Sequence, residues 1–300
     1  MSLDILILAH RHDRLIEASK DREQGFTKKH ASAQRYTISI LAEIWHQRGL
    51  NVGIKRGPSR FSTAQAVAAI NHVNLTVTPV PYLNYLRRFS SVVNGGFIDT
   101  SKSKYCRDLL SYGDNYDGPV IVKTDLNFGG KPERKLQRRA WPFRYLRLLG
   151  WSKAAASPDL DPYAYPIYDH ASHVPIEVWR NPRLVIQKFQ PERDNAGLYR
   201  LRSWYVCGDR GFHVATVAKE PIVKGLNTIC RQVVDIVTPP EMETLRHEMC
   251  VDYGRFDYVL ISGKPVVYDI NRTPAITAAS EAQYASQWRD LAEGIATFLN

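Results

Sequence analysis

The sequence predicts a protein of two parts, an α/β domain followed by a sheet-rich α+β half. The chain has 300 residues, which corresponds to about two domains of roughly 150 residues each. It opens with a strand–helix–strand pattern, whereas its second half contains strand pairs separated by short glycine turns. Apolar residues make up 44% of the chain, enough to fill packed cores and to argue against disorder.

The first part begins with a buried strand over Leu3–Ala9, a helix over residues 34–47 that Gly49 ends, and a strand over residues 52–55. No G-x-G-x-x-G follows the first strand, so a dinucleotide site of the usual kind is not indicated. Further elements of this α/β domain, which we end at residue 101, are a helix over residues 62–70 and strands over residues 75–77 and 91–93.

A strand over residues 119–123 runs directly into a loop that contains Gly129 and Gly130. Glycines let backbone N–H groups come close to a ligand. Lys123 ends the strand, just before these glycines. This position favours contact with phosphate over plain solvation, and the loop is a candidate phosphate site.

Residues 131–153 carry eight basic residues, among them Arg138 and Arg139, and only one acidic residue, Glu133. A solvated surface is the first interpretation, because most charged runs are solvated faces. A basic lid over an anionic substrate is a second interpretation. A nucleic-acid patch, with Trp and Tyr rings for stacking, is the third.

The second half is predicted to be rich in antiparallel strands, with a helix that starts in a Thr238–Glu241 capping box and ends before Gly254, and a last helix near the C-terminus. Glycine turns at residues 207–211 and 262–264 separate two of the strand pairs. The predicted strands cover residues 184–189, 202–206, 212–218, 256–261 and 266–271.

The last strand pair carries a candidate metal site. If its hairpin turns on Gly263, then Asp257 lies directly opposite Asp269, and Asn271 lies on the same face two residues further on. Two carboxylates and an amide oxygen resemble a Mg²⁺ site that phosphates and waters would complete. The alternatives are that Lys or Arg neighbours neutralise the two acids, or that the register differs.

These motifs together resemble one family. The run Gly254-Arg255-Phe256-Asp257, followed after a turn by Asp269-Ile270-Asn271 and Pro274, resembles the C-terminal metal motif of ATP-grasp enzymes, most closely D-alanine–D-alanine ligase. The resemblance covers about residues 90–276. It implies an ATP-grasp fold of two α+β subdomains, residues 102–195 and 196–300, preceded by a Rossmann-like α/β domain over residues 1–101.

The resemblance also implies roles for single residues. Asp257, Asp269 and Asn271 would hold Mg²⁺, and Arg255 would act on the transferring group. Phosphates of ATP would lie on Lys102, Lys123 and the Gly129–Gly130 loop, and the adenine hinge would include Gln187, Phe189 and Glu192. Arg202 and Lys219 are the further catalytic candidates, although Lys224, with help from Asn227, follows the same strand and the sequence does not decide which lysine points inward.

The sequence departs from the family pattern at three positions, and one of them bears on the expected substrate. Asp269 stands where a Glu is usual, Gln187 replaces the usual hinge acid, and Ala275 follows Pro274 where the dipeptide ligases carry Gly. A Cβ at residue 275 would crowd the approach of a substrate backbone. D-Alanine is therefore disfavoured as the substrate.

The predicted function is an ATP- and Mg²⁺-dependent ligase that forms ADP and joins a carboxylate to an amine or thiol through an acyl phosphate. Two alternatives stay open, namely phosphoryl transfer to a hydroxyl of a sugar or polymer, and non-catalytic binding of RNA or an acidic polymer. The net charge of +10 suits anionic small-molecule substrates, and nucleic acid is not favoured as the partner. Four scattered cysteines and the absence of an apolar segment long enough for a membrane favour a reducing cytosol and no membrane partner.

Overall fold

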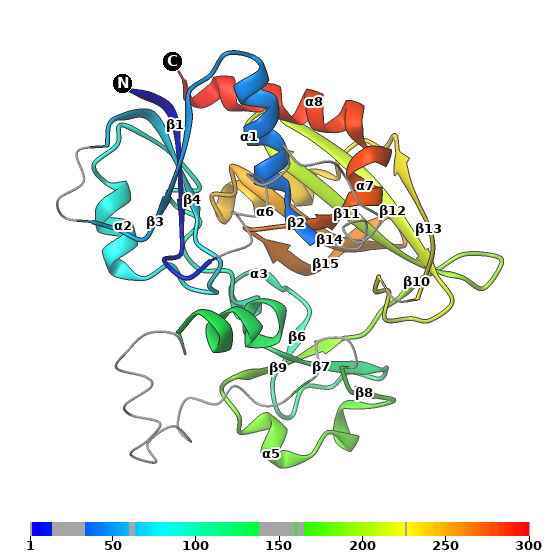
Figure 1. Ribbon diagram of the computed structural model, residues 1–300. Coiled ribbons are helices and arrows are strands. Elements are labelled where there is room, and N and C mark those ends of the chain that lie inside the picture. Colours follow the sequence, from blue (N-terminus) through cyan, green and yellow to red (C-terminus); the bar gives the residue numbers. More distant parts are fainter. Residues whose placement is uncertain are drawn as a thin grey trace.

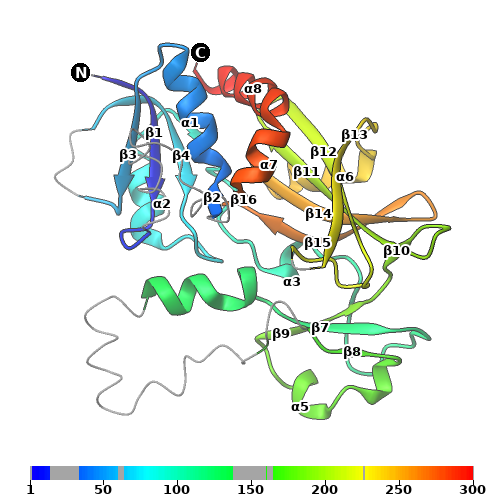
Figure 2. The ribbon, with the colours of Figure 1, turned by 45° about the vertical axis from the view of Figure 1, so that its right-hand side comes forward.

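The computed structural model describes residues 2–13, 34–59, 64–137, 160, 165–225 and 227–299, without the side chains of residues 34, 136 and 137. Figure 1 shows a parallel sheet beside a larger antiparallel sheet, with a smaller group of strands and short helices below them. Figure 2 shows that the smaller group is joined to the rest through the segment around α3 (Lys102–Tyr105) and through β10 (Glu192–Arg193).

The N-terminal sheet has the order β3-β1-β4-β5, and every described strand pair in it is parallel. The strands are β1 (Leu3–Ala9), β3 (Val52–Arg56), β4 (Ala66–His72) and β5 (Ser91–Val93). Alternate residues of β1 pack in two directions. Ile5 and Ile7 join the core with α1 (Thr37–Gln47), whereas Leu6 and Leu8 join the core with α2 (Val80–Leu86).

The predicted helix over residues 62–70 is wrong, because β4 occupies residues 66–72 in the middle of this sheet. A strand with helices packed on both of its faces is apolar throughout, so it cannot be distinguished from a buried helix by periodicity. The predicted strand over residues 75–77 is reduced to one bridge between Val77 and Asp99. Residues 34–36, assigned to a helix, form the short strand β2 (Gln34–Tyr36), which pairs with β16 (Ala275–Thr277).

The smaller sheet has the order β6-β9-β7-β8, with antiparallel pairing throughout its described strands. Its strands are β6 (Leu109–Leu110), β7 (Val120–Thr124), β8 (Ile167–Tyr168) and β9 (Leu184–Lys188). The short helices η6 (Ala171–His173) and α5 (Ile176–Trp179) supply apolar residues to its core. β7 and β9 agree with the predicted strands to within one residue.

The large sheet has the order β13-β12-β11-β14-β15, with β10 paired to β11. Trp204 and Phe256 pack on one face with α6 (Pro240–Glu248), whereas Tyr205 and Tyr253 pack on the other face with α8 (Ala285–Glu293). The strands are β11 (Tyr199–Cys207), β12 (Arg210–Ala218), β13 (Thr228–Val234), β14 (Tyr253–Ile261) and β15 (Lys264–Asn271).

Two details of this half differ from the sequence prediction. β13 was not predicted. The helix α6 begins after Pro239 without a side-chain cap, and the hydroxyl of Thr238 lies 2.9 Å from Nε2 of His213 instead of capping the helix.

The first and last parts of the chain share one core. Helix α1 packs beside α8, and Nε1 of Trp45 donates a hydrogen bond to the carbonyl oxygen of Ala292 at 2.8 Å. The remaining short elements are η3 (Asn127–Gly130), η4 (Glu133–Gln137), α7 (Ala278–Gln283) and η7 (Gly294–Phe298). The four cysteines are unpaired thiols. Among the helices described, none has the length and apolar character needed to cross a bilayer.

Candidate active site

The hairpin of β14 and β15 turns on two residues, not on Gly263 alone. Ser262 and Gly263 have φ angles of 50° and 80°, the left-handed conformation of a tight two-residue hairpin turn. The pairing next to this turn, for example Val259 with Val266, is therefore shifted by one residue from the predicted register. The predicted turn was wrong.

A β-bulge restores the predicted pairing further along the hairpin. The register shifts between Asp257 and Tyr258, so that Asp257 lies opposite Asp269 and Arg255 lies opposite Asn271. A slip of one residue would have turned Asp269 to the other face of the sheet. The predicted opposition of Asp257 and Asp269 is confirmed, and the bulge that produces it was not foreseen.

Basic and hydroxyl groups already contact the Asp257 carboxylate. Ser203 on the neighbouring strand β11 donates its hydroxyl to Oδ1 at 2.7 Å, and Nη2 of Arg255 donates to Oδ2 at 2.8 Å. Arg255 lies on the same face two residues earlier in β14, as the strand period predicts. Its guanidinium also lies 5.8 Å from the ring centroid of Tyr205.

The Asp269 carboxylate lies among several positive charges. Nζ of Lys102 is 3.4 Å from Oδ1, and the hydroxyl of Tyr105 donates to the same oxygen at 3.1 Å. Burial alone would raise the pKa of Asp269, but the charges of Lys102, Arg255, Lys224 and Lys123 outweigh it and lower the pKa. Asp269 is therefore a carboxylate at neutral pH.

The three candidate ligands suit a magnesium ion by their chemistry. Asp257, Asp269 and Asn271 present hard oxygen atoms from adjacent positions of one hairpin, and all three line the same cavity. The amide oxygen of Asn271 also accepts a hydrogen bond from the backbone N–H of Thr273 at 2.9 Å, which fixes its orientation. No cluster of three or more His, Cys, Asp or Glu side chains suited to a metal occurs in the part of the chain that the structure describes.

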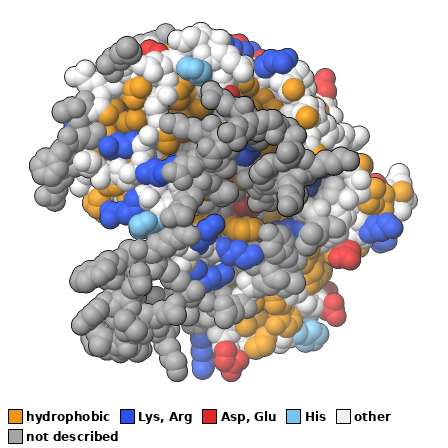
Figure 3. Space-filling model, in the orientation of Figure 1, with side chains coloured by type: hydrophobic (Ala, Val, Ile, Leu, Met, Phe, Trp, Pro, Cys, Tyr) orange, Lys and Arg blue, Asp and Glu red, His pale blue; other side chains and the backbone are white. Residues whose placement is uncertain are grey.

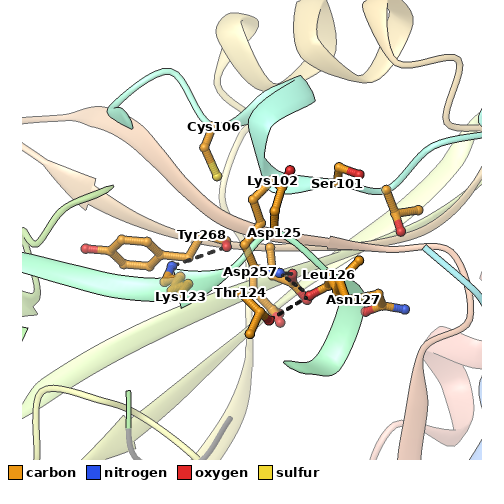
Figure 4. A network of polar contacts seen from close by, with 12 residues as sticks. Ser101, Lys102, Cys106, Lys123, Thr124, Asp125, Leu126, Asn127, Asp257 and Tyr268 are labelled. Atoms are coloured by element: carbon orange, nitrogen blue, oxygen red, sulfur yellow. Dashed lines mark hydrogen bonds and ion pairs between the residues drawn. The ribbon is translucent and has the colours of Figure 1, made fainter. Parts of the chain in front are cut away.

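Lys123 reaches this region from the end of β7. Its Nζ donates to Oε1 of Gln187 at 2.8 Å and lies 4.4 Å from the ring centroid of Tyr268. Burial lowers the pKa of Lys123 to about 7. Figure 4 shows Lys123 beside Tyr268, with Lys102 coming from α3 toward the carbonyl of Leu126, to which it donates at 2.9 Å.

Gln187 does not take the position that the resemblance implied. Its side chain is fully buried, its Nε2 donates to the carbonyl oxygen of Val267 at 3.0 Å, and it does not line the cavity. The Gln187 side chain therefore orients Lys123 by a hydrogen bond from outside the cavity. Phe189, two residues later, does line the cavity, together with Ile121 and Tyr268.

The glycine loop adopts a strained backbone next to the two lysines. Phe128, Gly129 and Gly130 have φ angles of 45°, 63° and 70°, which only glycine adopts without cost. The N–H of Asn127 donates to the hydroxyl of Thr76 in the N-terminal part at 2.9 Å. The side-chain oxygen of Asn127 is buried and has no hydrogen-bond partner among the described residues. Asn127 lines the cavity, and the sequence prediction missed it.

One cavity of about 430 Å³ is lined by Lys102, Lys123, Asn127, Asp257, Asp269 and Asn271, whereas Gly129 and Gly130 do not line it. The lysines and arginines that line it are Lys102, Lys123, Arg200, Lys224, Arg231 and Arg255. On the face seen in Figure 3, Lys and Arg side chains gather near the middle of the molecule, between the upper part and the part that carries β6 to β9. The cavity is thus a cationic site with two carboxylates at one wall, suited to an anionic ligand.

The structure does not bring Arg202 and Glu192 into this cavity. Their side chains pair with each other at 2.6 and 3.0 Å, and Glu192 also accepts the N–H of Leu260 at 2.8 Å. Arg202 alternates along β11 with Leu201 and Ser203, which line the cavity. A strand presents successive side chains to opposite faces, so Arg202 lies on the face opposite to Leu201 and Ser203, where its guanidinium is bound to Glu192.

Lys219 is also displaced from the site. It lies exposed at the end of β12 and does not line the cavity, whereas Lys224 does. Burial lowers the pKa of Lys224. The side-chain oxygen of Asn227 accepts the N–H of Lys224 at 2.8 Å and so fixes the turn that presents this lysine.

Most of the basic segment 131–153 lies outside the described residues. Arg138 and Arg139 lie outside the described residues, as do all residues from 138 to 153. The described start of the segment contacts the glycine loop and the N-terminal part. Lys131 lies 4.9 Å from the ring centroid of Phe128, and Glu133 accepts hydrogen bonds from both the N–H and the hydroxyl of Thr76 at 2.6 Å.

Comparison with known proteins shows a likeness of fold. No protein-family model matches the sequence, and no curated protein matches it either. The structure is similar to the ATP-grasp ligase PsnB complexed with a phosphomimetic variant of minimal precursor, Mg and ADP, with a TM-score of 0.55, 10% identity and 100% of each chain covered. The complex of PsnB with precursor peptide PsnA2 and AMPPNP gives a TM-score of 0.53 at 10% identity, over 100% of this chain and 99% of that chain.

A third similar structure belongs to a different ligase. D-alanine–D-alanine ligase from Bacillus anthracis matches with a TM-score of 0.51 and 10% identity, over 99% of this chain and 97% of that chain. Identity at this level shows the fold alone. The chain resembles the ATP-grasp superfamily in fold, as the motifs in its sequence had indicated.

Proposed function

We propose that this protein is an ATP- and Mg²⁺-dependent ligase that forms ADP and joins a carboxylate to an amine or thiol through an acyl phosphate. The observation that carries the proposal is the cavity in which Asp257 and Asp269, held opposite each other by the bulged hairpin, face four cationic side chains. The fold shared with known ATP-grasp ligases supports ATP-dependent ligase chemistry.

The charges in this cavity suit a nucleotide polyphosphate. With Lys123 protonated, the four cations whose charges act on Asp269, namely Lys102, Arg255, Lys224 and Lys123, exceed the two carboxylates Asp257 and Asp269 by two charges. A buried excess of one sign is costly until a ligand of opposite charge binds. The apolar wall formed by Ile121, Phe189 and Tyr268 beside Lys123 suits a base.

The residues of the chain divide the proposed work between them. Asp257, Asp269 and Asn271 would hold Mg²⁺, which neutralises charge on the phosphates when bound. Lys102 and Lys123 would position the phosphates, and Arg255 would stabilise charge that develops on the transferring group or on the acyl oxygen. Lys224 takes the place that we had given to Lys219, because Lys224 is the one that lines the cavity.

The proposal also includes a division of the chain into domains. We assign residues 1–101 to a Rossmann-like domain and residues 102–195 and 196–300 to the two subdomains of the grasp. The four-stranded parallel sheet lies within the first range and the β6–β9 sheet within the second, which supports the division. Strand β10, at residues 192–193, is the part of the large sheet that falls before the last boundary.

Trapping with hydroxylamine tests the reaction class. ATP, Mg²⁺ and pooled amino acids, peptides and sugar acids are incubated with the enzyme, and ADP and hydroxamate are both measured. An acyl phosphate reacts with hydroxylamine, so hydroxamate should form in step with ADP. ADP formation without hydroxamate, accompanied by a phosphorylated hydroxyl product, would identify a phosphotransferase instead.

A further inference from the structure

The outermost strand of the large sheet, β13, has an open edge in the part of the chain that the structure describes. The sheet order begins with β13, and β12 is its neighbour on the inner side. Figure 1 shows β13 at the margin of the sheet. An edge strand presents backbone N–H and C=O groups that can pair with another strand, and Lys or Pro residues often protect such an edge. Strand Thr228–Val234 contains neither Lys nor Pro.

Exposed apolar side chains gather along this edge. Ile229, Val233 and Val237 are 50%, 40% and 93% exposed. Val237 lies between β13 and α6, so all three belong to one continuous stretch of chain at the margin of the sheet. A group of large apolar side chains left in water favours a surface that another protein covers.

One side chain shows which backbone groups face the open edge. Nε2 of Gln283, an exposed residue at the end of α7, donates to the backbone oxygen of Arg231 at 2.7 Å. That oxygen therefore points away from β12. Backbone groups of alternate residues point to the same side of a strand, so Val233 also presents its N–H and C=O groups at the open edge.

The charges along this edge are complementary to those of a second copy. Nη1 of Arg231 lies 3.5 Å from the hydroxyl of Ser280, and Nη2 lies 3.4 Å from the hydroxyl of Thr228. These long contacts to neutral groups leave the charge of Arg231 uncompensated by any acid among the described residues. Asp235 is exposed. Arg231 and Asp235 lie two residues before and two residues after Val233, so an antiparallel pair of β13 strands centred on Val233 brings opposite charges together.

We propose that the protein forms a symmetric dimer in which the β13 strands of two copies pair antiparallel about Val233. The two large sheets join into one continuous sheet, as in other cases of strand addition at an open edge. Val233 packs against its own copy, and Ile229 comes close to Val237 of the partner subunit. The apolar side chains left exposed in a single copy are thereby covered.

The dimer also gives Arg231 an acidic partner. Its guanidinium pairs with Asp235 of the partner subunit, and its backbone oxygen accepts the N–H of that residue in place of Gln283. Arg231 lines the cavity, so each copy places a carboxylate at the cavity wall of the other. The inference does not depend on the proposed ligase chemistry.

The charges select this register over its neighbours. Pairing centred on Arg231 would place two arginines directly opposite each other, and pairing centred on Asp235 would do the same with two aspartates. Like charges directly opposite each other destabilise a sheet. Pairing centred on Val233 avoids both and forms two opposite-charge pairs related by the two-fold axis.

Charge variants test both the interface and its register. Asp235→Arg places two positive charges opposite each other at both ends of the interface, and we expect the dissociation constant of the dimer to rise about tenfold or more. The double variant Arg231→Asp, Asp235→Arg exchanges the two charges and should restore the dimer. Asp117→Arg is the matched control, because Asp117 is an exposed acid between β6 and β7, outside the large sheet.

Sedimentation velocity of the full chain, from about 1 to 100 μM, gives the dissociation constant of each variant. Thermal unfolding at the lowest concentration checks that each variant is folded. Hydrogen exchange provides a measurement that needs no substitution, because the backbone amides of residues 229–237 should exchange more slowly at the concentration where the dimer forms. We expect dimers of the wild-type protein, of Asp117→Arg and of the double variant, and a largely monomeric Asp235→Arg protein.

Other results overturn the proposal. A wild-type protein that stays monomeric over the whole range would refute the dimer. A dimer that Asp235→Arg leaves intact, or in which the amides of residues 229–237 exchange as fast as in the monomer, is formed through another surface. A folded double variant that remains monomeric would contradict the register centred on Val233. None of these results bears on nucleotide binding, which is measured separately, so the proposed function stands or falls by its own test.

Discussion

Arg255 has two possible roles that an experiment must separate, namely catalysis and charge balance for Asp257. It pairs with Asp257 at 2.8 Å, so it both neutralises a carboxylate and lies at the proposed site of phosphoryl transfer. Arg255→Lys keeps the charge but loses the planar fork. We expect kcat to fall about tenfold or more, with ATP affinity and melting temperature nearly unchanged. A kcat close to wild type, or a large loss of melting temperature in Arg255→Ala, would show that the arginine only balances charge.

Asp269 should be essential as a charged oxygen ligand. Asp269→Asn keeps the size of the side chain but removes its charge beside Lys102 and Tyr105. Turnover should fall by about a hundredfold or more. Asp269→Glu retains the carboxylate and should keep much of the activity. Steady-state rates at increasing Mg²⁺ concentrations check both variants, and a fully active Asp269→Asn enzyme would refute the metal assignment.

We expect Lys123 to make nucleotide binding dependent on pH. Its pKa is lowered by burial to about 7, and the protonated form is the one that attracts phosphate. Below pH 7 the affinity for Mg-ADP should be constant, and above pH 7 it should fall by up to about tenfold per pH unit, because binding must then take up a proton. Calorimetry between pH 6 and 9 in two buffers of different ionisation enthalpy measures both the affinity and the proton uptake.

Gln187 offers the control for this pH dependence. It is the hydrogen-bond partner of Nζ of Lys123 at 2.8 Å, and a carboxylate at this position would raise the pKa of the lysine. Gln187→Glu should therefore move the fall in affinity to a higher pH. An affinity that does not change between pH 6 and 9 in the wild-type protein would show that Lys123 does not meet the phosphates.

Among the elements, the packing of α8 on the large sheet depends on two glycines in contact. A Cβ added at Gly294 would overlap the backbone carbonyl of Cys207, and one added at Gly208 would overlap the carbonyl of Gly294. Backbone atoms cannot move aside as a flexible side chain can. Gly294→Ala should lower the free energy of unfolding by about 2 kcal/mol or more, as measured by urea denaturation.

Gly225 is the control for this prediction. The nearest atom to a Cβ added there is the far end of the Arg231 side chain, at 3.6 Å. Gly225→Ala should leave the free energy of unfolding within about 0.5 kcal/mol of wild type. Equal stabilities of the two variants would mean that α8 does not pack on β11 through this contact.

The sequence predicted strands best where the apolar pattern suited a strand but not a helix. β1, β5, β7 and β9 match the predicted strands to within one residue, and Asp257 was placed opposite Asp269 correctly. β4 was taken for a helix because its alanine-rich run suits both structures until the sheet around it is known. The two-residue turn at Ser262 shifts the pairing of β14 with β15 by one residue, and the bulge at Asp257 shifts it back. No local sequence pattern indicates either shift.

The sequence did not show in which direction several candidate side chains point, and this limited the prediction of the site. Lys219 and Lys224 both follow β12, and the fold of the chain after that strand decides which of the two faces the cavity. The side chain of Asn227 holds the backbone at Lys224 in place. Arg202 was assigned to the site by resemblance, but its place in the alternation of β11 sends it to Glu192 on the other face. Gln187 was expected to contact the adenine of ATP. Its side chain instead lies outside the cavity and accepts a hydrogen bond from Lys123.

At the scale of the whole molecule, the site is assembled from parts that are distant in the chain. The guanidinium of Arg272, which follows Asn271, donates to the carbonyl oxygens of Phe97, Val73 and Leu75 in the N-terminal part. Thr76 of that part contacts both Asn127 and Glu133. The N-terminal part therefore fixes the β14–β15 hairpin and the glycine loop relative to each other.

The central claim is that this cavity binds a magnesium nucleotide through Lys102, Lys123 and the two opposed aspartates. The most direct test is calorimetric titration of ATP, with and without Mg²⁺, into the wild-type protein, into Lys102→Met, and into Lys188→Met as control. Lys188 follows Gln187 in β9, lies over Tyr116 and does not line the cavity. The account predicts Mg²⁺-dependent binding that Lys102→Met weakens by about tenfold or more and that Lys188→Met leaves unchanged. Absence of binding to the wild-type protein, or equal affinity in Lys102→Met, would contradict it.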